Sequence, residues 1–223
     1  MSQPAATRPQ QLILFGRNFL KHPKMLGSLI PSSRYLVNHL LRQVDWSRAR
    51  VVVEYGPGVG TFTGEILRRL RPDGALVAIE TNHEFVHFLR RTVADDRLHV
   101  VHGSAEEADA ILEERGLAHA DYVISGIPYT TMPREMRERI LRTTHSLLHP
   151  TGAFLVYQFT RAVLPYLQQV FGLVHQEFEP RNIMPARLFY CRRHPERRAE
   201  VRRRELRSSA HAASKPEPQV SRR

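Results

Sequence analysis

The sequence predicts a single α/β domain built on a mostly parallel sheet with helices on both faces. Short apolar runs alternate with helical stretches along most of the chain, and parallel strands require helical crossovers of this kind. The first strand leads directly into a glycine-rich turn and a helix, which is the start of a nucleotide-binding βαβ unit. With 223 residues, 42% of them hydrophobic, the chain is long enough to bury one core.

Two segments precede the predicted domain, which spans residues 25–192. We expect residues 1–9 to be unstructured and residues 10–24 to form a basic amphipathic helix. Its apolar face and its positive charges are provided by Leu12, Phe15, Phe19, Arg17, Lys21 and Lys24. Such a helix can lie in a membrane interface or pack on the domain, and periodicity alone does not separate the two.

The next helix is predicted by a proline break and a capping serine. Ile30-Pro31 ends the preceding pattern, and Ser32 or Ser33 can cap a helix over residues 34–43. This helix leads into the first strand of the sheet.

The first βαβ unit has the most specific pattern in the chain. Residues 51–53 are all valine, as in a buried strand, and a glycine turn, a helix over 61–70 and a second strand over 75–79 follow. Glu80 comes directly after the second strand, where a carboxylate can accept hydrogen bonds from ribose hydroxyls. The turn has the spacing G-x-G-x-G, and Glu54 stands just before it.

The helix predicted over residues 82–93 contains a formal match to the zinc-protease pattern H-E-x-x-H, from His83 to His87. Two histidines one turn apart can share a metal ion. Phe85, Val86 and Leu89 nevertheless indicate that this helix packs on the sheet. We therefore expect the match to be coincidental and predict no metal site.

The rest of the domain continues the alternation of strands and helices. The remaining strands are predicted over 97–102, 120–125, 152–159, 173–179 and 187–191, and the remaining helices over 106–115, 132–148 and 162–171. We expect the last two strands to form an antiparallel pair. Ligands of such sheets bind beyond the carboxyl ends of the strands, so the turns that follow the first four strands are expected to meet in one pocket.

The formal charge of +11 is concentrated at the end of the chain. Residues 192–223 contain eleven Lys or Arg and four Glu, a net charge of +7, and almost no large apolar side chain. We therefore expect residues 193–223 to be a disordered or frayed basic tail. The composition leaves open whether this tail is simply solvated or binds anionic lipid or nucleic acid.

Composition also limits the location of the protein. No apolar run approaches the ~20 residues that span a bilayer, and the N-terminus lacks the apolar core and cleavage site of a signal peptide. The single Cys191 excludes an internal disulfide framework. These features predict a cytoplasmic protein.

The motifs together resemble class I S-adenosylmethionine-dependent methyltransferases. The pattern E-x-G-x-G-x-G begins at Glu54, an acid follows the second strand, a small polar turn follows the third, and a Pro-Tyr loop follows the fourth. This resemblance implies a Rossmann-like, mostly parallel seven-stranded sheet. It also implies S-adenosylmethionine as the methyl donor and S-adenosylhomocysteine as the product.

Within that class, four segments resemble the soluble bacterial phospholipid N-methyltransferases. They read LKHPKMLGSLIPSSRYL, EYGPGVGTFT, SGIPYTTMP and NIMPARLFYC, and the resemblance covers about residues 10–192. It implies methylation of phosphatidylethanolamine, through mono- and dimethyl intermediates, to phosphatidylcholine. We expect such an enzyme to be a monomer that binds the inner face of the cell membrane and no nucleic acid.

The resemblance also implies which residues hold the donor. Glu80 would bind the ribose hydroxyls, Ser104 and Ala105 the adenine, and Gly126 and Ile127 the methionine end. The complete expected donor site is Glu54, Tyr55, Gly56, Gly58, Gly60, Thr61, Glu80, Thr81, Ser104, Ala105, Gly126 and Ile127.

The acceptor site is a hypothesis from chemistry. We expect the ring of Tyr129 to contact the increasingly methylated ammonium by a cation–π interaction, with Tyr35 and Tyr157 as weaker candidates. Arg187 is the first choice for the phosphodiester, because a guanidinium matches phosphate oxygens in a bidentate fork, and Arg34 is the second.

The requirement for a lipid changes the interpretation of residues 10–24. A diacyl lipid leaves a bilayer only at a cost of about 0.8 kcal/mol per exposed CH₂ group, so the enzyme must dock on the membrane. This favours an interfacial helix that reaches anionic phosphates.

Two other functions stay open. Adenine N6-methyltransferases of ribosomal RNA or DNA have an Asn or Asp at the start of the Pro-Tyr loop, where this chain has Gly126. Gly126 lacks the side-chain acceptor that a poorly nucleophilic ring amine needs, which weakens this alternative without excluding it. A non-catalytic lipid- or nucleic-acid-binding module on the same fold is the third candidate.

Overall fold

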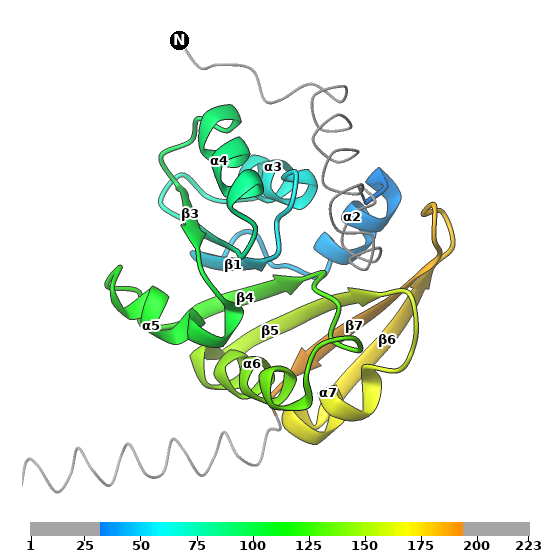
Figure 1. The fold of residues 1–223 in the computed structure, drawn as a ribbon. Coiled ribbons are helices and arrows are strands. Elements are labelled where there is room, and N and C mark those ends of the chain that lie inside the picture. Colours follow the sequence, from blue (N-terminus) through cyan, green and yellow to red (C-terminus); the bar gives the residue numbers. More distant parts are fainter. Residues whose placement is uncertain (1–31, 194–223) are drawn as a thin grey trace, which may run out of the picture.

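The protein forms a seven-stranded sheet between two layers of helices (Figure 1). The computed structural model describes residues 32–193, and all structural statements concern these residues. The strand order is β3-β2-β1-β4-β5-β7-β6. The expected Rossmann-like α/β fold is therefore confirmed.

Within residues 32–193, six strands of the sheet run in one direction, and β7 alone runs in the opposite direction. The strands are β1 (Val51–Tyr55), β2 (Ala75–Glu80), β3 (Leu98–His102), β4 (Ala120–Ser125), β5 (Leu148–Gln158), β6 (Leu173–Glu179) and β7 (Ala186–Arg192). Strand β7 is antiparallel to both β5 and β6, so the sheet is mixed. The predicted antiparallel pair at the end of the domain is confirmed.

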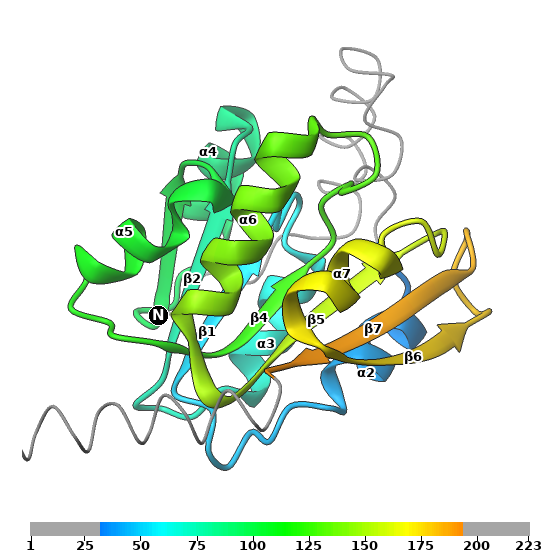
Figure 2. The same ribbon diagram turned by 90° about the horizontal axis from the view of Figure 1, so that it is seen from below.

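Among residues 32–193, helices cover both faces of the sheet (Figure 2). Helices α2 (Arg34–Leu41), α3 (Thr61–Arg69) and α4 (His83–Thr92) lie on one face, and α5 (Ala108–Glu113), α6 (Arg134–Leu147) and α7 (Leu164–Phe171) lie on the other. Alternate residues of β1 face opposite layers: Val52 packs with α2 and α3, and Val53 packs with α5 and α6. Burial on both faces explains the continuous valine run.

Most predicted boundaries differ from the observed ones by no more than two residues, and two elements differ in a way that the structure explains. The helix predicted from residue 106 is a 3₁₀ turn over Ala105–Glu107 followed by α5, because the Ser104 side chain accepts a hydrogen bond from the Glu106 amide. Strand β5 begins at Leu148 rather than residue 152, since Leu148 already pairs with Ala120 across a bulge.

The N-terminus of helix α2 is hydrogen-bonded to the turn between β6 and β7. The side chain of Ser33 caps this helix. The Ser33 amide donates to Asn182 Oδ1 at 2.8 Å, and the Ser33 hydroxyl donates to the Arg181 carbonyl at 2.8 Å. The β6–β7 turn, residues 180–185, therefore lies beside the N-terminus of α2.

The described residues test only part of the predicted organisation. The amphipathic segment 10–24, with Leu12, Phe15, Phe19, Arg17, Lys21 and Lys24, lies outside them, and so does the tail from residue 194. None of the helices between residues 32 and 193 is long and apolar enough to cross a membrane.

Candidate active site

The glycine turn between β1 and α3 brings two loops of the sheet edge into contact. Gly56 and Gly58 adopt φ angles of 69° and 55°, which side chains rarely tolerate. A Cβ atom at Gly56 would lie 2.7 Å from Ile127 Cγ2, in the loop after β4. A Cβ atom at Gly58 would meet no atom within 4 Å, so the turn is open there. The first and fourth strand ends thus meet, as expected.

Glu80 is fixed beside this turn. Its side chain is buried, and its two carboxyl oxygens accept hydrogen bonds from the amides of Gly58 at 3.1 Å and Asn82 at 2.9 Å. Burial raises the pKa of Glu80 above its ordinary value. The carboxyl group expected to bind ribose hydroxyls therefore lies at the glycine turn.

Glu54 is a second buried carboxyl group next to the turn. The Thr63 hydroxyl donates to Glu54 Oε2 at 2.7 Å. Burial raises the pKa of Glu54 to about 8, and the nearby charge of Glu80 acts in the same direction. Burial thus favours the protonated form of both carboxyl groups, and a ligand with positive charge bound beside them would favour the ionised form. Sequence analysis missed Thr63, although its position two residues into α3 is a recognisable signal.

The other expected donor residues have different environments. Thr61 begins α3, Thr81 is exposed after β2, and Ser104 and Ala105 form the turn after β3. Tyr55 requires a correction, because its ring is buried in the core and its hydroxyl lies 3.1 Å from Thr144 Oγ1 on α6. The alternation of β1 turns this side chain toward the opposite layer from Glu54, so only the backbone of Tyr55 lies at the turn.

The loop after β4 is shaped by Tyr157 of β5. A Cβ atom at Gly126 would overlap the Tyr157 hydroxyl and ring, so only glycine leaves room for this tyrosine. The Tyr157 ring stacks on Phe62 with centroids 5.1 Å apart, and its hydroxyl is hydrogen-bonded to Ser32. Burial raises the pKa of Tyr157 to about 12, so it stays protonated at neutral pH. A hydroxyl therefore stands where a side chain at Gly126 would be.

Tyr129 does not occupy the place expected for it. Its side chain is fully buried, its hydroxyl lies 2.8 Å from Ser125 Oγ, and its ring packs edge-on against Phe154. The Tyr129 amide donates to the Ile127 carbonyl, and this tight turn directs the side chain into the core. We therefore correct the cation–π hypothesis, because a ring in the core does not line an open slot in this structure.

The expected phosphate-binding residues are divided between two places. The Arg34 guanidinium donates to the Tyr35 hydroxyl at 3.0 Å, and Arg181 lies over the same ring at 4.6 Å from its centroid. The hydrogen bond from Arg34 lowers the pKa of Tyr35. Arg187 is on the α7 face of β7, where its guanidinium lies 4.6 Å from the Phe178 ring centroid.

Arg181 is the cation that sequence analysis missed. It pairs with Glu179 at 3.1 Å and shares the Tyr35 ring with Arg34, which is 147 residues away in the chain. Although burial alone would raise it, hydrogen bonds from Arg181 and His39 hold the pKa of Glu179 at about 2. No local pattern reports a contact over this sequence distance.

The H-E-x-x-H match lies on α4, where His83 and His87 have ring centroids 6.4 Å apart. The helix buries Phe85, Val86 and Leu89. Within residues 32–193 no group of three or more His, Cys, Asp or Glu side chains could hold a metal ion.

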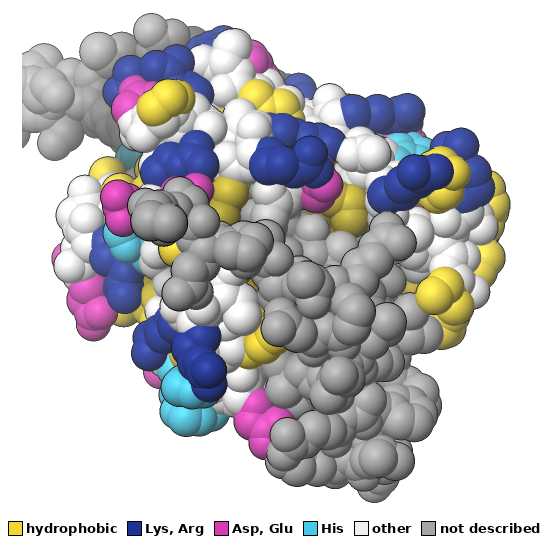
Figure 3. Space-filling model, turned by 90° about the horizontal axis from the view of Figure 1, so that it is seen from above, with side chains coloured by type: hydrophobic (Ala, Val, Ile, Leu, Met, Phe, Trp, Pro, Cys, Tyr) yellow, Lys and Arg dark blue, Asp and Glu magenta, His cyan; other side chains and the backbone are white. Residues whose placement is uncertain are grey.

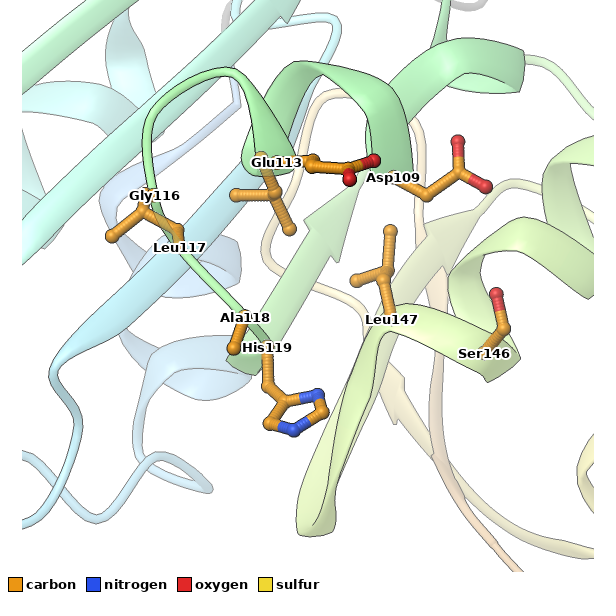
Figure 4. Close-up of a pocket in the computed structure, with 9 residues that line it drawn as sticks. Asp109, Glu113, Gly116, Leu117, Ala118, His119, Ser146 and Leu147 are labelled. Carbon is orange, nitrogen blue, oxygen red and sulfur yellow. The ribbon is translucent and has the colours of Figure 1, made fainter. Parts of the chain in front are cut away.

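A hollow of about 460 Å³ lies at the opposite edge of the sheet, near the starts of the strands (Figure 4). Asp109 and Glu113 of α5 border it, and His119 points away from both carboxyl groups (Figure 4). Its position separates it from the glycine turn, which follows the end of β1.

Comparison with known proteins gives one family and one relative that spans nearly the whole chain. Residues 13–161 match the family described as ribosomal RNA adenine dimethylase. Ornithine lipid N-methyltransferase from Singulisphaera acidiphila is 34% identical, over 82% of this chain and 96% of that protein.

More distant similarities are partial or concern only the fold. Ribosomal RNA small subunit methyltransferase A from Mycoplasma mycoides subsp. mycoides is 25% identical, over 49% of this chain and 41% of that protein. The solved structure of human methyltransferase-like protein 13 in complex with SAH is 19% identical, with a TM-score of 0.54 over 90% of this chain and 95% of that chain.

Proposed function

We propose that this chain, which belongs to the ribosomal RNA adenine dimethylase family and uses S-adenosylmethionine as its methyl donor, methylates the amine of a membrane lipid. The similarity to ornithine lipid N-methyltransferase carries this proposal, because it extends over 96% of that protein. Phosphatidylethanolamine and its mono- and dimethyl forms are the substrates that we propose first. An ornithine lipid, which also presents a primary amine, is the second.

The residues around the glycine turn fit the donor. S-adenosylmethionine supplies a methyl group bonded to a positively charged sulfur atom. Glu80 has a buried carboxyl group suited to ribose hydroxyls, and the open side of Gly58 permits close approach of a ligand to the backbone. The Glu54 carboxyl group, when ionised, offers a negative charge to a cationic donor. We propose that these residues, with Ser104 and Ala105, hold the donor.

On the acceptor side we assign Tyr157 a positioning role. An amine attacks the methyl group only in its neutral form, with its lone pair in line with the bond that breaks. The Tyr157 hydroxyl is protonated at neutral pH and is hydrogen-bonded to Ser32, and it reaches the start of the loop after β4. Its oxygen can accept an N–H hydrogen bond from the amine and so orient the lone pair.

Methylation of adenine in RNA or DNA is the second candidate, because the family model favours it. Those enzymes use an Asn or Asp at the position of Gly126 to bind the exocyclic amine. Here an Asn or Asp side chain at position 126 would collide with the Tyr157 ring, so the chain cannot have such a side chain together with Tyr157 in its observed position. This geometry favours an aliphatic amine over a planar base.

Incubation with labelled S-adenosylmethionine tests the proposal. The purified protein is given, in separate reactions, phosphatidylethanolamine vesicles, ornithine lipid vesicles or undermodified ribosomal RNA. We expect label in a lipid and none in RNA, and the preferred lipid identifies the substrate. Label in RNA with none in either lipid would contradict the proposal and select the second candidate.

A further inference from the structure

The turn between β6 and β7 exposes apolar side chains that have no place in the core. Ile183 is 77% exposed and Met184 is 41% exposed, and Phe178 at the end of β6 is 45% exposed. The neighbouring strand residues Leu188 and Phe189 are buried, so the three exposed side chains are grouped at the turn end of the hairpin. Adjacent large exposed apolar residues indicate an interaction surface.

This turn is held in a defined shape. Asn182 Nδ2 donates to the Met184 carbonyl at 3.0 Å, and Asn182 Oδ1 accepts from the Ser33 amide. Glu179 accepts from the Arg181 amide at 2.9 Å. Ile183 and Met184 are therefore presented by a turn that is tied at both ends.

Arginines surround the apolar side chains. Arg34 and Arg181 are exposed, and Arg187 is half-buried. Among the described residues, neither Arg34 nor Arg187 forms an ion pair with a carboxylate, whereas Arg181 pairs with Glu179. The carboxylate closest in the chain, Glu179, is 1% exposed and already binds Arg181 and His39. The surface around the turn is therefore positively charged and complements an anionic partner.

The turn lies at the same edge of the sheet as the glycine turn. Strand β7 is antiparallel to β5, and Arg187 at its start pairs with Gln158 at the end of β5. Hydrophobic and basic side chains gather at the right-hand end of the face in Figure 3, over the end of the β6–β7 hairpin. A planar surface that touches this end can thus approach the acceptor side of the site.

We propose that the hairpin tip, defined as Phe178, Ile183 and Met184 with Arg34, Arg181 and Arg187, docks on an anionic lipid bilayer. The apolar side chains enter the boundary between headgroups and acyl chains, and the arginines bind lipid phosphates. Docking at this edge brings the lipid amine to the site without removing the lipid from the bilayer. The choice of a bilayer as partner rests on the proposed lipid substrate.

The test compares two charge substitutions in the full chain. The double variant Ile183→Glu/Met184→Glu places acids on the hairpin tip. The matched control Leu173→Glu replaces an apolar residue that is 47% exposed at the other end of β6. Binding is measured by flotation with phosphatidylcholine vesicles that contain or lack phosphatidylglycerol, and thermal unfolding shows that both variants are folded.

We expect the double variant to bind anionic vesicles at least about tenfold more weakly, and the control to bind like the unchanged protein. Equal binding by all three would overturn the docking proposal, as would a dimer that the double variant dissociates. Activity separates the two proposals. A protein that binds vesicles through the tip but methylates no lipid amine would refute the substrate and leave docking in place.

Discussion

The missing side chain at Gly126 leaves room for Tyr157, to which we assign a role on the acceptor side of the site. The hydroxyl lies where any Cβ atom at Gly126 would be, and stacking on Phe62 keeps the ring in position. Adenine N6-methyltransferases have an Asn or Asp side chain at the position of Gly126. In this chain the Tyr157 hydroxyl is the polar group in that space. We therefore propose that the site suits a freely rotating aliphatic amine better than a planar base.

Replacement of Tyr157 by Phe tests this role. The variant keeps the ring and its stacking on Phe62 but loses the hydroxyl. We expect kcat/KM for a primary lipid amine to fall about tenfold, since one hydrogen bond is lost. The rate with a dimethylated lipid amine should change little, because that neutral amine has no N–H group to donate. Equal loss on both substrates would show a structural role only.

Glu54 makes stability depend on pH in a predictable direction. Its pKa is about 8 in the folded protein and about 4.5 in an ordinary environment. Between these two pH values, the folded state keeps the Glu54 proton and the unfolded state loses it. The stability of the folded state, as far as Glu54 affects it, is therefore highest below about pH 4.5 and falls as the pH rises to 8. We expect the free energy of unfolding to fall by on the order of 3 kcal/mol between pH 5 and pH 8 through this group.

Urea unfolding of the unchanged protein and of Glu54→Gln at several pH values measures this effect. The amide does not titrate, so the difference between the two proteins should shrink or change sign as the pH rises. A difference that is constant over this range would show that Glu54 titrates normally in the folded state.

At the scale of elements, the sequence predicts the strands and helices of the sheet well and the contacts of the β6–β7 turn poorly. The valine run of β1 and the capping serine of α2 are local signals, and both are confirmed. The contacts of Ser33 with Arg181 and Asn182 join residues about 150 positions apart, so no periodicity contains them. The inward direction of Tyr129 likewise depends on a tertiary core around Phe154.

Asn182 connects the two elements and provides a test of that contact. Asn182→Ala removes the acceptor for the Ser33 amide and the donor to the Met184 carbonyl. We expect a loss of about 1–2 kcal/mol in the free energy of unfolding, measured by urea titration. Asn182→Asp retains the acceptor and should lose less. If Ala and Asp variants were both as stable as the unchanged protein, the turn would not be fixed by these bonds.

At the scale of the molecule, the proposed donor residues, the Tyr157 hydroxyl and the hairpin tip share one edge of the sheet. Parallel strands place Gly56, Glu80 and Gly126 there, and the antiparallel β7 brings the β6–β7 turn to the same edge. Topology therefore explains why the predicted loops converge.

The central claim, that the acceptor is a lipid amine, is tested most directly by competition in one vessel. The protein receives labelled S-adenosylmethionine together with amine-bearing lipid vesicles and undermodified ribosomal RNA, and lipid and RNA are separated before counting. We expect the label in the lipid fraction, and we expect Tyr157→Phe to reduce it. Label in the RNA fraction with none in the lipid would show that the acceptor is RNA and not a lipid amine.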